Sequence, residues 1–558
     1  MDIKKSKLIL VAILLLALGV RLIGIDYGLP LALVHDEPPF IFGALKMLEL
    51  KTLIPALHSS DFESAMYYPP YLSYLYLPFF ALVIGFKYLF VTHDLALLKN
   101  LLTADPTIFF LIARIISAFL GTATVYLVYL ISKRLFNSYK TALLSALFLA
   151  LSYSHVLFSH WGRHWVPVTF IFTLAIYFLT RTDWSDSKRY LLSALTLGLG
   201  VGVNYQMAVG ILILPLWYLF YNRRSIREAL SARYVWQALA VFASLGVLAY
   251  VLYPAGLPVN SSDVINSGKS LVGFLTGYAF HFSTFIFNDP ALLLFTLIGI
   301  FFAWKRERNL LYTLLSFIFL YIAVFYILLF QVDRYIIMLL PMLALLAGYG
   351  ANAFLERAEL ATNRNRVTLV TRLLVAIILL YSGASVARLN FLLLKNDTRI
   401  QAINFIKSNI PAGAKILVAG EQMRISSTPE AIAEQEKLDP DSLRSVDRAE
   451  RELDLPDAYH ALNLYTVRSK AFDPTVYNYL ILDQDFITRK NLPSFNSLRG
   501  KASKLVTFEG YERRTQDLVN WLGGGLSARE TLKWFAGGFL HLWSIPNAGP
   551  TVVVREIK

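Results

Sequence analysis

Two adjacent carboxylates, Asp36 and Glu37, follow the first long apolar run of the chain. They stand in the stretch VHDEPPF, with a histidine before them and two prolines after them. A single acid there could be no more than a polar residue at an interface. The prolines, however, stop a helix from continuing through the pair, and neighbouring side chains point in different directions. We expect one acid to act as general base toward an acceptor hydroxyl, and the other to position the acceptor or hold a cation.

Three arginines are expected at the same end of the apolar segments as the acid pair. Guanidinium groups within an apolar layer are costly and usually face a cavity, a partner or an anion, and their forked donors match phosphate oxygens. These arginines are Arg114 in ARIISAFLGT, Arg163 in SHWGRHW and Arg334 in FQVDRYIIMLLP. For Arg334, a structural salt bridge with Asp333 is the alternative. The side chains expected to line the same cavity are His35, Tyr68 and Tyr335. Such a site suits a lipid phosphate that enters from the bilayer.

The composition indicates a polytopic membrane protein. The chain has 558 residues, of which 56% are hydrophobic and only 16% charged. The apolar residues come in blocks of roughly 15 to 22, long enough to cross about 30 Å of hydrocarbon. Because there is no cysteine, disulfides and thiolate metal sites are excluded. The net charge of +14 is interpreted as a topology signal and not as a nucleic-acid site.

Eleven membrane spans are predicted, with the N-terminus cytoplasmic and the C-terminus outside. The loops assigned to the cytoplasm carry twenty Lys and Arg residues, and the short opposite loops carry three, as the positive-inside rule requires. A removable signal peptide is the alternative for the first span, but no small-residue cleavage site follows it. The predicted spans are 8–25, 109–131, 141–158, 165–180, 190–203, 206–221, 235–253, 289–303, 310–330, 335–354 and 369–393.

Two apolar stretches need the charge rule to interpret them. The stretch 190–221 has basic clusters at both ends, so it must cross twice, and we predict a tight turn near Asn204. The stretch 72–91 contains Pro78 and Lys87 and is predicted to lie along the interface or to re-enter the membrane. The consequence is a long outer loop, 26–108, that contains the acid pair.

The composition changes at Asn396, where charged residues become frequent and apolar runs shrink to strand length. Four runs read as buried strands, and DTRIQAINFIKSNI has helical spacing. We expect residues 1–395 to form the membrane domain and residues 396–558 a small extracytoplasmic α/β domain for packing or acceptor docking. The strand-like runs are 415–420, 479–483, 504–509 and 551–557.

Several motifs occur in an order and on a common side that resemble a known family. The chain resembles the polyprenyl-phosphate-sugar-dependent glycosyltransferases of superfamily C, in particular the protein O-mannosyltransferase and aminoarabinose transferase relatives. The resemblance covers nearly the whole chain, although each motif alone is short. Besides the Asp-Glu pair, the motifs are YYPPYLSYL (67–75), RIISAFLGTATVYLVYLISKRLF (114–136), GLGVGVNY (198–205), DRYIIMLLPMLALLAG (333–348) and DTRIQAINFIKSNIPAGAKI (397–416).

The resemblance implies an inverting hexosyl- or pentosyltransferase that takes a sugar from a carrier such as dolichyl or undecaprenyl phosphate. It implies Asp36 as general base, and Arg114 and Arg334 as ligands of the donor phosphate. The acceptor stays open between a protein hydroxyl, a lipid and a glycan. Three positions depart from the relatives: His164 stands where an acid often follows the outer arginine, and Asn204 and Tyr68 stand where relatives carry a lysine.

A metal and two other functions remain open at this point. Some relatives bind a divalent cation (Mg, Mn or Zn), and the candidate ligands are Asp36, Glu37, His58 and His281. A transporter or flippase for a lipid-linked or anionic solute should show repeated halves with interrupted helices, and no such repeat is found. A non-catalytic scaffold would leave the acid pair and the arginines unexplained. The expected location is the cell membrane, with the endoplasmic reticulum as the alternative.

Overall fold

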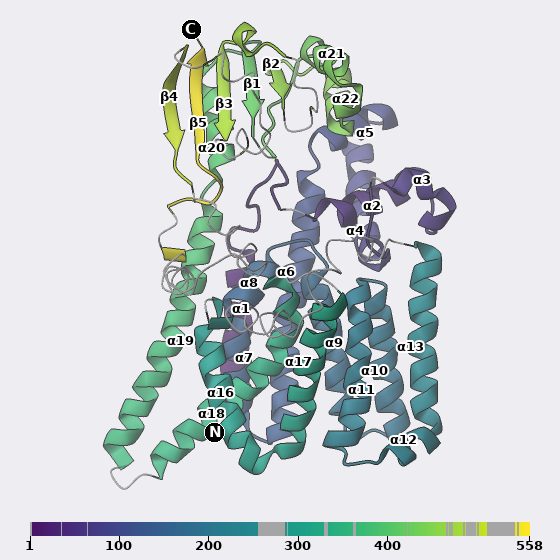
Figure 1. The fold of residues 1–558 in the computed structure, drawn as a ribbon, viewed down its shortest axis with the longest axis vertical. Coiled ribbons are helices and arrows are strands. Elements are labelled where there is room, and N and C mark those ends of the chain that lie inside the picture. Colours follow the sequence, from purple (N-terminus) through teal and green to yellow (C-terminus); the bar gives the residue numbers. More distant parts are fainter. Residues whose placement is uncertain are drawn as a thin grey trace.

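The chain forms a helical bundle with a small sheet at one end. The fold was obtained as a computed structural model, and it describes residues 3–34, 36–63, 65–254, 285–286, 288–328, 333–360, 364–420, 422–464, 467, 472–483, 486, 498, 501–510, 542–543 and 546–557. The sheet and the C-terminus lie at one end of the bundle, and the N-terminus lies toward the other (Figure 1). A multi-pass helical membrane protein with a small C-terminal α/β domain is therefore confirmed, whereas the N-in, C-out orientation stays a prediction.

Each predicted span overlaps helical structure in the bundle, and residues 329–330 of the span 310–330 lie outside the described residues. The stretch 190–221 turns at Asn204 as expected, because the helix before it ends at Val201 and the next begins at Tyr205. Among the described residues, five helices are long and apolar enough to cross a membrane, or up to six if the bent pair α7 and α8 is one span. The bundle elements are α1 (Ile3–Leu22), α6 (Thr107–Phe136), α7 (Tyr139–Ala150), α8 (Tyr153–Ser159), α9 (Trp165–Leu179), α10 (Asp186–Val201), η2 (Tyr205–Leu212), α11 (Ile213–Leu216), η3 (Trp217–Tyr221), α12 (Ile226–Ser231), α13 (Arg233–Leu252), α16 (Pro290–Arg306), α17 (Arg308–Leu328), η5 (Asp333–Leu339), α18 (Leu340–Glu359) and α19 (Arg364–Leu394).

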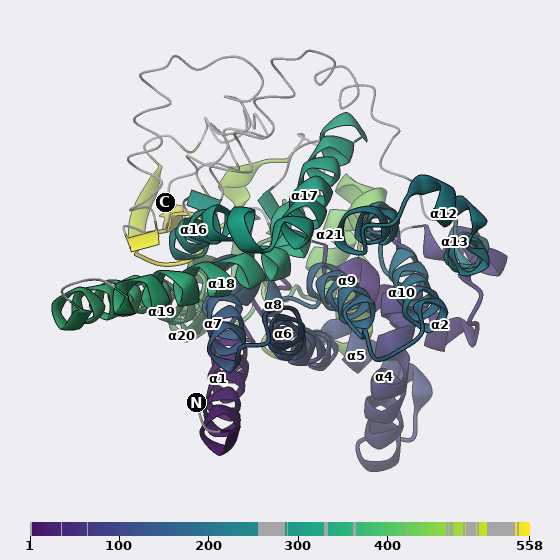
Figure 2. The same ribbon diagram turned by 90° about the horizontal axis from the view of Figure 1, so that it is seen from below.

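The long loop after α1 folds into short elements beside the end of the bundle that faces the sheet. One of them, α4, is long and apolar enough to cross a membrane. It nevertheless runs across the direction of the bundle helices and projects sideways from them (Figures 1 and 2). This direction agrees with the predicted interfacial segment. The elements of the loop are α2 (Pro38–Leu50), η1 (Pro55–His58), α3 (Ser59–Phe62), α4 (Tyr71–Phe90) and α5 (Leu95–Ala104).

Helices α16 and α18 approach each other closely through glycines. A Cβ atom on Gly299 would lie 2.0 Å from the carbonyl oxygen of Leu346, and one on Gly350 would lie 2.3 Å from that of Phe295. Only hydrogen atoms fit in this space, so small residues permit backbone contact between two membrane helices. Helix α18 is thereby fixed at the centre of the bundle, and the segment η5 that precedes it is fixed with it.

The bend between α7 and α8 is stabilised by a buried cation from α1. The two helices meet at 59°, and Arg21 is completely buried beside the break. Its guanidinium donates to the last carbonyls of α7, where a positive charge suits the helix dipole. The hydrogen-bond partners of Arg21 are the carbonyls of Ala17, Leu149 and Ala150, the hydroxyl of Ser159 and the ring of His155. This contact sets the direction of α8 and of the loop that follows it.

The C-terminal domain has a five-stranded sheet in the order β2-β1-β3-β5-β4. Strand β1 pairs in parallel with β2 and β3, while β5 is antiparallel to β3 and β4. Side chains alternate along β1, so Ile416 and Val418 pack with α20 on one face while Leu417 and Ala419 pack on the other. All four predicted strands are present, and β2 is additional. The elements are α20 (Thr398–Asn409), β1 (Lys415–Ala419), α21 (Pro429–Leu438), η6 (Pro440–Ser442), α22 (Ser445–Leu453), β2 (His460–Asn463), η7 (Pro474–Val476), β3 (Tyr479–Asp483), β4 (Ala502–Phe508) and β5 (Val552–Ile557).

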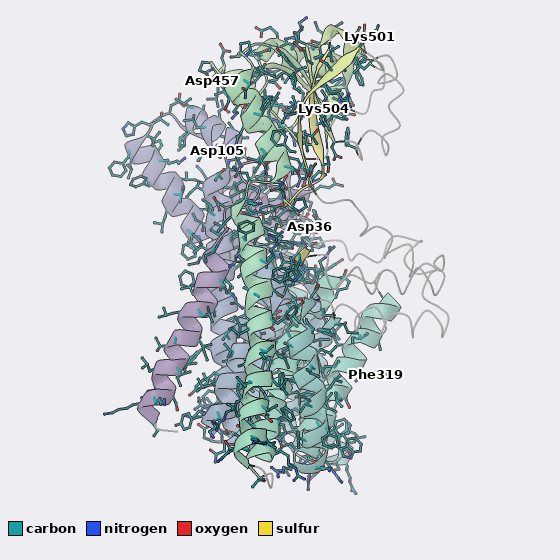
Figure 3. The ribbon with its side chains drawn as sticks, turned by 90° about the vertical axis from the view of Figure 1, so that its left-hand side faces the viewer. Asp36, Asp105, Phe319, Asp457, Lys501 and Lys504 are labelled. Atoms are coloured by element: carbon teal, nitrogen blue, oxygen red, sulfur yellow. The ribbon has the colours of Figure 1, made fainter. Side chains whose placement is uncertain are left out.

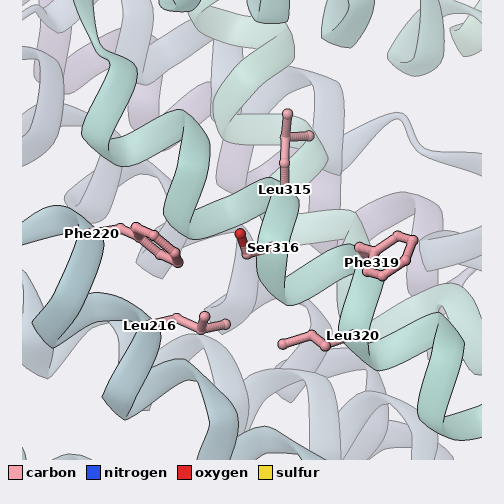
Figure 4. A pocket seen from close by; sticks show the side chains of 6 residues that line it. All are labelled: Leu216, Phe220, Leu315, Ser316, Phe319 and Leu320. Atoms are coloured by element: carbon pink, nitrogen blue, oxygen red, sulfur yellow. The ribbon is translucent and has the colours of Figure 1, made fainter. Parts of the chain in front are cut away.

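An open apolar groove of about 400 Å³ lies between α17 and the segment of α11 and η3 (Figure 4). Its lining residues are Leu216, Phe220, Leu315, Ser316, Phe319 and Leu320. Phe319 lies well below Asp36 along the bundle (Figure 3). The lining contains no ionisable side chain, so the groove offers no group for acid–base chemistry.

Candidate active site

The acid pair lies at the turn that leads into α2. Asp36 has a φ of +62°, a left-handed conformation that aspartate tolerates better than most residues. Glu37 precedes Pro38 and Pro39, and the prolines form the first positions of α2, where their fixed φ suits a helix start. The two carboxylates therefore diverge at a rigid turn. In Figure 3 Asp36 lies between the bundle and the C-terminal domain.

Glu37 is completely buried and forms an ion pair with Arg114 of α6. Nε of Arg114 donates to Oε1 at 2.9 Å, and Nη2 donates to Oε2 at 2.7 Å. The backbone N–H of Gly162 also donates to Oε1, at 2.6 Å. A Cβ on Gly162 would lie 2.7 Å from that of Ala113, so glycine lets the loop come this close. With three charged or polar donors around it, Glu37 is a structural anchor.

Arg114 is also bound on its other side. Its Nη1 donates to the carbonyl oxygens of Ile25 at 2.8 Å and Tyr27 at 2.7 Å, and the side chain is only 1% exposed. The guanidinium therefore joins α6 to the loop after α1 and to the acid pair. The donors of Arg114 face Glu37 and backbone carbonyls, and its role as a ligand of the donor phosphate stays a prediction.

Asp36 has a different environment, which is open to solvent. Its side chain is 27% exposed, whereas that of its partner Arg163 is 4% exposed. Nη2 of Arg163 donates to Oδ2 at 2.5 Å, and the hydroxyl of Tyr67 donates to Oδ1 at 2.8 Å. Burial, and then the charge of Asp36, raises the pKa of Tyr67, so the phenol remains a hydrogen-bond donor.

A stack of rings connects Asp36 to the arginines. The rings of Tyr67 and Tyr68 have centroids 4.7 Å apart, those of Tyr68 and His164 are 4.9 Å apart, and those of His164 and Trp165 are 4.1 Å apart. Burial, and then the charge of Asp36, raises the pKa of Tyr68 to about 12. Burial, and then the charges of Arg163 and Arg334, holds the pKa of His164 well below its ordinary value. His164 is therefore neutral at physiological pH.

Arg163 and Arg334 lie on the same indole. The Cζ atom of each is 5.8 Å from the ring centroid of Trp165. The ring of Tyr335 is 5.4 Å from that of Trp165. Burial lowers the pKa of Arg163, and the neighbouring carboxylate of Asp36 raises it in compensation. Two cations from distant parts of the chain thus converge beside Asp36, as the sequence predicts. The alternative pairing of Arg334 with Asp333 falls on a side chain outside the described set.

The structure brings most of the predicted site residues together. The structure joins Asp36, Arg163, Arg334, Tyr68 and Tyr335, and the ion pair of Glu37 and Arg114 lies at the residue next to Asp36 in the chain. His58 ends the short helix η1 in the outer loop. His35 and His281 lie outside the described residues.

Sequence reasoning missed three residues of this region. Tyr67 was visible in the YYPP motif but was not assigned to Asp36, which it contacts directly. Trp165 follows the outer arginine, and both Arg163 and Arg334 lie over its indole ring. Aromatic residues are common in membrane proteins, so the sequence alone does not indicate this contact. Arg21 is an arginine inside a predicted span, and that fact alone marks it for attention.

Among the described residues, the candidate ligands do not form a site for a divalent cation, and the candidate His281 lies outside these residues. No group of three or more His, Asp or Glu side chains among them could hold a metal ion. Both oxygens of Glu37 accept hydrogen bonds from Arg114, and Asp36 is bonded to Arg163 and Tyr67. We therefore assign no step of the reaction to a metal.

Residues 109–250 match the family model of dolichyl-phosphate-mannose-protein mannosyltransferase. This segment begins just before Arg114 and includes Arg163, and it is about a quarter of the chain. The match confirms over these residues the resemblance that the motifs indicate. No curated protein sequence matches the chain.

Three solved structures of sugar transferases are similar at low identity. An oligosaccharyltransferase from Archaeoglobus fulgidus, tethered to an acceptor peptide, has 11% identity and a TM-score of 0.47, over 100% of this chain and 89% of that chain. ArnT from Cupriavidus metallidurans bound to undecaprenyl phosphate has 13% identity and a TM-score of 0.48, over 90% of this chain and 96% of that chain. Arabinofuranosyltransferase AftD from Mycobacteria has 14% identity and a TM-score of 0.40, over 100% of this chain and 40% of that chain.

Proposed function

We propose that this protein transfers a sugar, with inversion, from a polyprenyl-phosphate carrier to an acceptor at the outer membrane face. The observation that carries the proposal is the partly exposed carboxylate of Asp36 beside two arginines on one indole. A carboxylate suits the removal of a proton from an acceptor, and guanidinium groups suit a leaving phosphate. The match of residues 109–250 to mannosyltransferases supports the same reaction class.

In the proposed reaction Asp36 takes the proton of the acceptor hydroxyl as its oxygen attacks the anomeric carbon. The bond from that carbon to the phosphate oxygen breaks, and its electron pair leaves with the polyprenyl phosphate. Arg163 and Arg334 stabilise the negative charge that develops there. Because attack and departure occur on opposite faces in one displacement, the configuration of the sugar inverts.

Glu37 and Arg114 have a positioning role in this proposal. Their buried ion pair fixes the turn that carries Asp36, and Gly162 in the same cluster fixes the loop that carries Arg163. Tyr67 holds the carboxylate from its other side. We propose that Tyr68 and Tyr335 line the sugar-binding space, because aromatic faces suit the apolar faces of sugars.

The location and the domains follow from the same reaction. We propose a cell-membrane protein whose residues 396–558 lie outside the cytoplasm, above the donor site, where the acceptor approaches. The sugar is a hexose or a pentose within this proposal, and protein, lipid and glycan acceptors fit it equally. A transporter for a lipid-linked solute has less support, since its binding residues should lie near the membrane midplane.

The test is sugar transfer from a panel of radiolabelled polyprenyl-phosphate sugars in membranes that contain the protein. Wild type should transfer at least one sugar, and Asp36→Asn should lower the rate by about 10²- to 10⁴-fold, the usual contribution of a general base. The control is Asp457→Asn, an exposed acid of the C-terminal domain (Figure 3). An unchanged rate in Asp36→Asn at equal expression would remove Asp36 as the base. Wild type that neither transfers any sugar nor binds any donor would contradict the proposal.

A further inference from the structure

Asp36 covers the guanidinium that is proposed to bind the donor phosphate. Arg163 is 4% exposed, whereas the carboxylate in contact with its Nη2 is 27% exposed. The 2.5 Å hydrogen bond between them is direct and charge-assisted. A phosphate oxygen that bonds to the same N–H of Nη2 must therefore take the place of Asp36 Oδ2, while the other N–H groups of the guanidinium can bond to the remaining phosphate oxygens. The proposed base and the proposed leaving group compete for one donor.

Three consecutive residues beside Asp36 have buried polar atoms without a hydrogen-bond partner. Nε of Arg163, both ring nitrogens of His164 and Nε1 of Trp165 are buried, and none has a hydrogen-bond partner among the described residues. Buried polar atoms normally have partners, so a cluster without them indicates a ligand. Guanidinium and indole nitrogens only donate, and a neutral imidazole donates once and accepts once. A phosphate joined to a sugar supplies both acceptor oxygens and donor hydroxyls.

We propose that Asp36 occupies, in the donor-free protein, the position on Arg163 that the phosphate of the donor takes, and that phosphate binding displaces the carboxylate and frees it to act as the base. This inference rests on the proposed function and adds an order to it: the base becomes available only after the donor has bound. One anion replaces another on Arg163, so the buried cation keeps a counter-charge throughout. Tyr67 can hold the displaced carboxylate near the acceptor, since its hydroxyl binds the other oxygen.

The competition predicts that an inactive variant binds the phosphate better than the active protein does. The Kd for polyprenyl phosphate, the product of the transfer, is measured in detergent for wild type and for Asp36→Asn. We expect the Kd of the variant to be about tenfold lower, because Arg163 no longer has to exchange a carboxylate. Asp36→Gly should show the same gain, since glycine accepts the positive φ of this position without strain. The second variant guards against a folding defect in the first.

Three controls separate this effect from general changes of charge or lipid binding. Asp457→Asn removes one distant acid and should leave the Kd unchanged. A polyprenol of the same length, which lacks the phosphate, should bind equally to all variants. In the Arg163→Gln background, Asp36→Asn should bring no gain, because the shared donor is absent. Inorganic phosphate shows whether the anion alone binds there, and we expect a measurable gain only with the lipid attached.

The outcomes distinguish this inference from the function on which it rests. Wild type that binds polyprenyl phosphate, with Asp36→Asn and Asp36→Gly binding it equally or more weakly, would overturn the displacement and leave the transferase proposal intact. A gain that persists in the Arg163→Gln background, or that appears for inorganic phosphate and not for the lipid, would also overturn it. Wild type that binds neither polyprenyl phosphate nor a polyprenyl-phosphate sugar would contradict the proposed function itself.

Discussion

At the scale of residues, two neighbouring acids have different tasks because their surroundings differ. Glu37 is enclosed by Arg114 and Gly162, whose donors take up both of its oxygens. Asp36 reaches solvent, and each of its oxygens accepts one hydrogen bond, Oδ2 from Arg163 and Oδ1 from Tyr67. An acid that must exchange protons with an acceptor has to be reachable. The exposed member of the pair therefore suits the chemistry, and the buried one suits the scaffold.

Removal of the buried anion should destabilise the fold strongly. Glu37→Gln leaves the guanidinium of Arg114 buried without a counter-charge, and we expect a loss of about 3–5 kcal/mol in the free energy of unfolding. Thermal melting in detergent, or a denaturant series, measures it. The double variant Glu37→Gln with Arg114→Met removes both charges and should be more stable than Glu37→Gln alone. If the single and the double variant had equal free energies of unfolding, the ion pair between Glu37 and Arg114 would not contribute to stability.

The neutral imidazole of His164 predicts a pH dependence of stability. Burial and the two arginines hold the pKa of His164 well below its ordinary value in the folded state, whereas an unfolded histidine titrates at about 6.5. The unfolded state therefore binds more protons below that pH, so this contribution to stability is present above it and is lost as the pH falls. The Tm of wild type should decline more between about pH 7 and pH 5 than the Tm of His164→Phe, which keeps a ring in the stack. Parallel pH curves would contradict a buried neutral histidine.

At the scale of elements, the site depends on where helices break. The bend between α7 and α8, held by Arg21 from α1, directs the chain into the loop 160–164 that supplies Gly162 and Arg163. The prolines that start α2 hold the acid pair at the neighbouring turn. Segment η5 brings Arg334 to the same indole because α18, which follows it, packs tightly on α16. Each functional side chain thus lies at the end of a helix whose direction is fixed by buried contacts.

The close contact of α16 and α18 can be tested with a single methyl group. Gly299→Ala would place a Cβ 2.0 Å from the carbonyl oxygen of Leu346, so the helices must separate, at a cost of about 1–3 kcal/mol or more. Gly383→Ala in α19 is the matched control, because nothing lies within 4 Å of its Cβ and alanine favours a helix. We expect a lower Tm for the first variant and an unchanged or higher Tm for the second. A Tm of Gly299→Ala equal to that of wild type would refute the backbone contact.

At the scale of the whole molecule, the C-terminal domain is joined to the loop that underlies the site. The hydroxyl of Tyr27 donates to Oδ2 of Asp397 at 2.7 Å, at the start of α20. The carbonyl of the same tyrosine accepts from Arg114, so two bonds connect the domain to the ion pair of Glu37 and Arg114. On the opposite side, α22 packs against α5 of the outer loop (Figure 1). The domain therefore has two attachments beside the proposed acceptor path.

Loss of the first attachment should loosen the start of α20. Tyr27→Phe removes the bond to Asp397 and keeps the ring, and we expect hydrogen exchange of the backbone amides near Asp397 to accelerate several-fold. Tyr74→Phe is the control, since its hydroxyl bond of 2.6 Å goes to the carbonyl of Leu53 within the outer loop. Exchange near Asp397 should be unchanged in that variant. Equal exchange in Tyr27→Phe and wild type would show that this bond does not hold the domain.

The sequence by itself determined which segments are helices of the bundle, the turn at Asn204 and four of the five strands. These features are readable because length, apolar runs and charge asymmetry act locally along the chain. Asp36, Arg163 and Arg334 could also be chosen as candidates, since charges beside an apolar layer are costly wherever they occur. Strand β2 was not predicted, because His460–Asn463 is too short to show a pattern.

Only the tertiary structure decided how the charges pair. Arg114, Arg163 and Arg334 are equivalent in sequence terms, and their roles separate only when Glu37 is found on the first and Asp36 on the second. The partners are 77 and 127 residues apart in the chain, so no local pattern indicates which arginine meets which acid. The physical reason is that a buried guanidinium pairs with the anion that lies closest to it. Which anion is closest depends on how the helices pack.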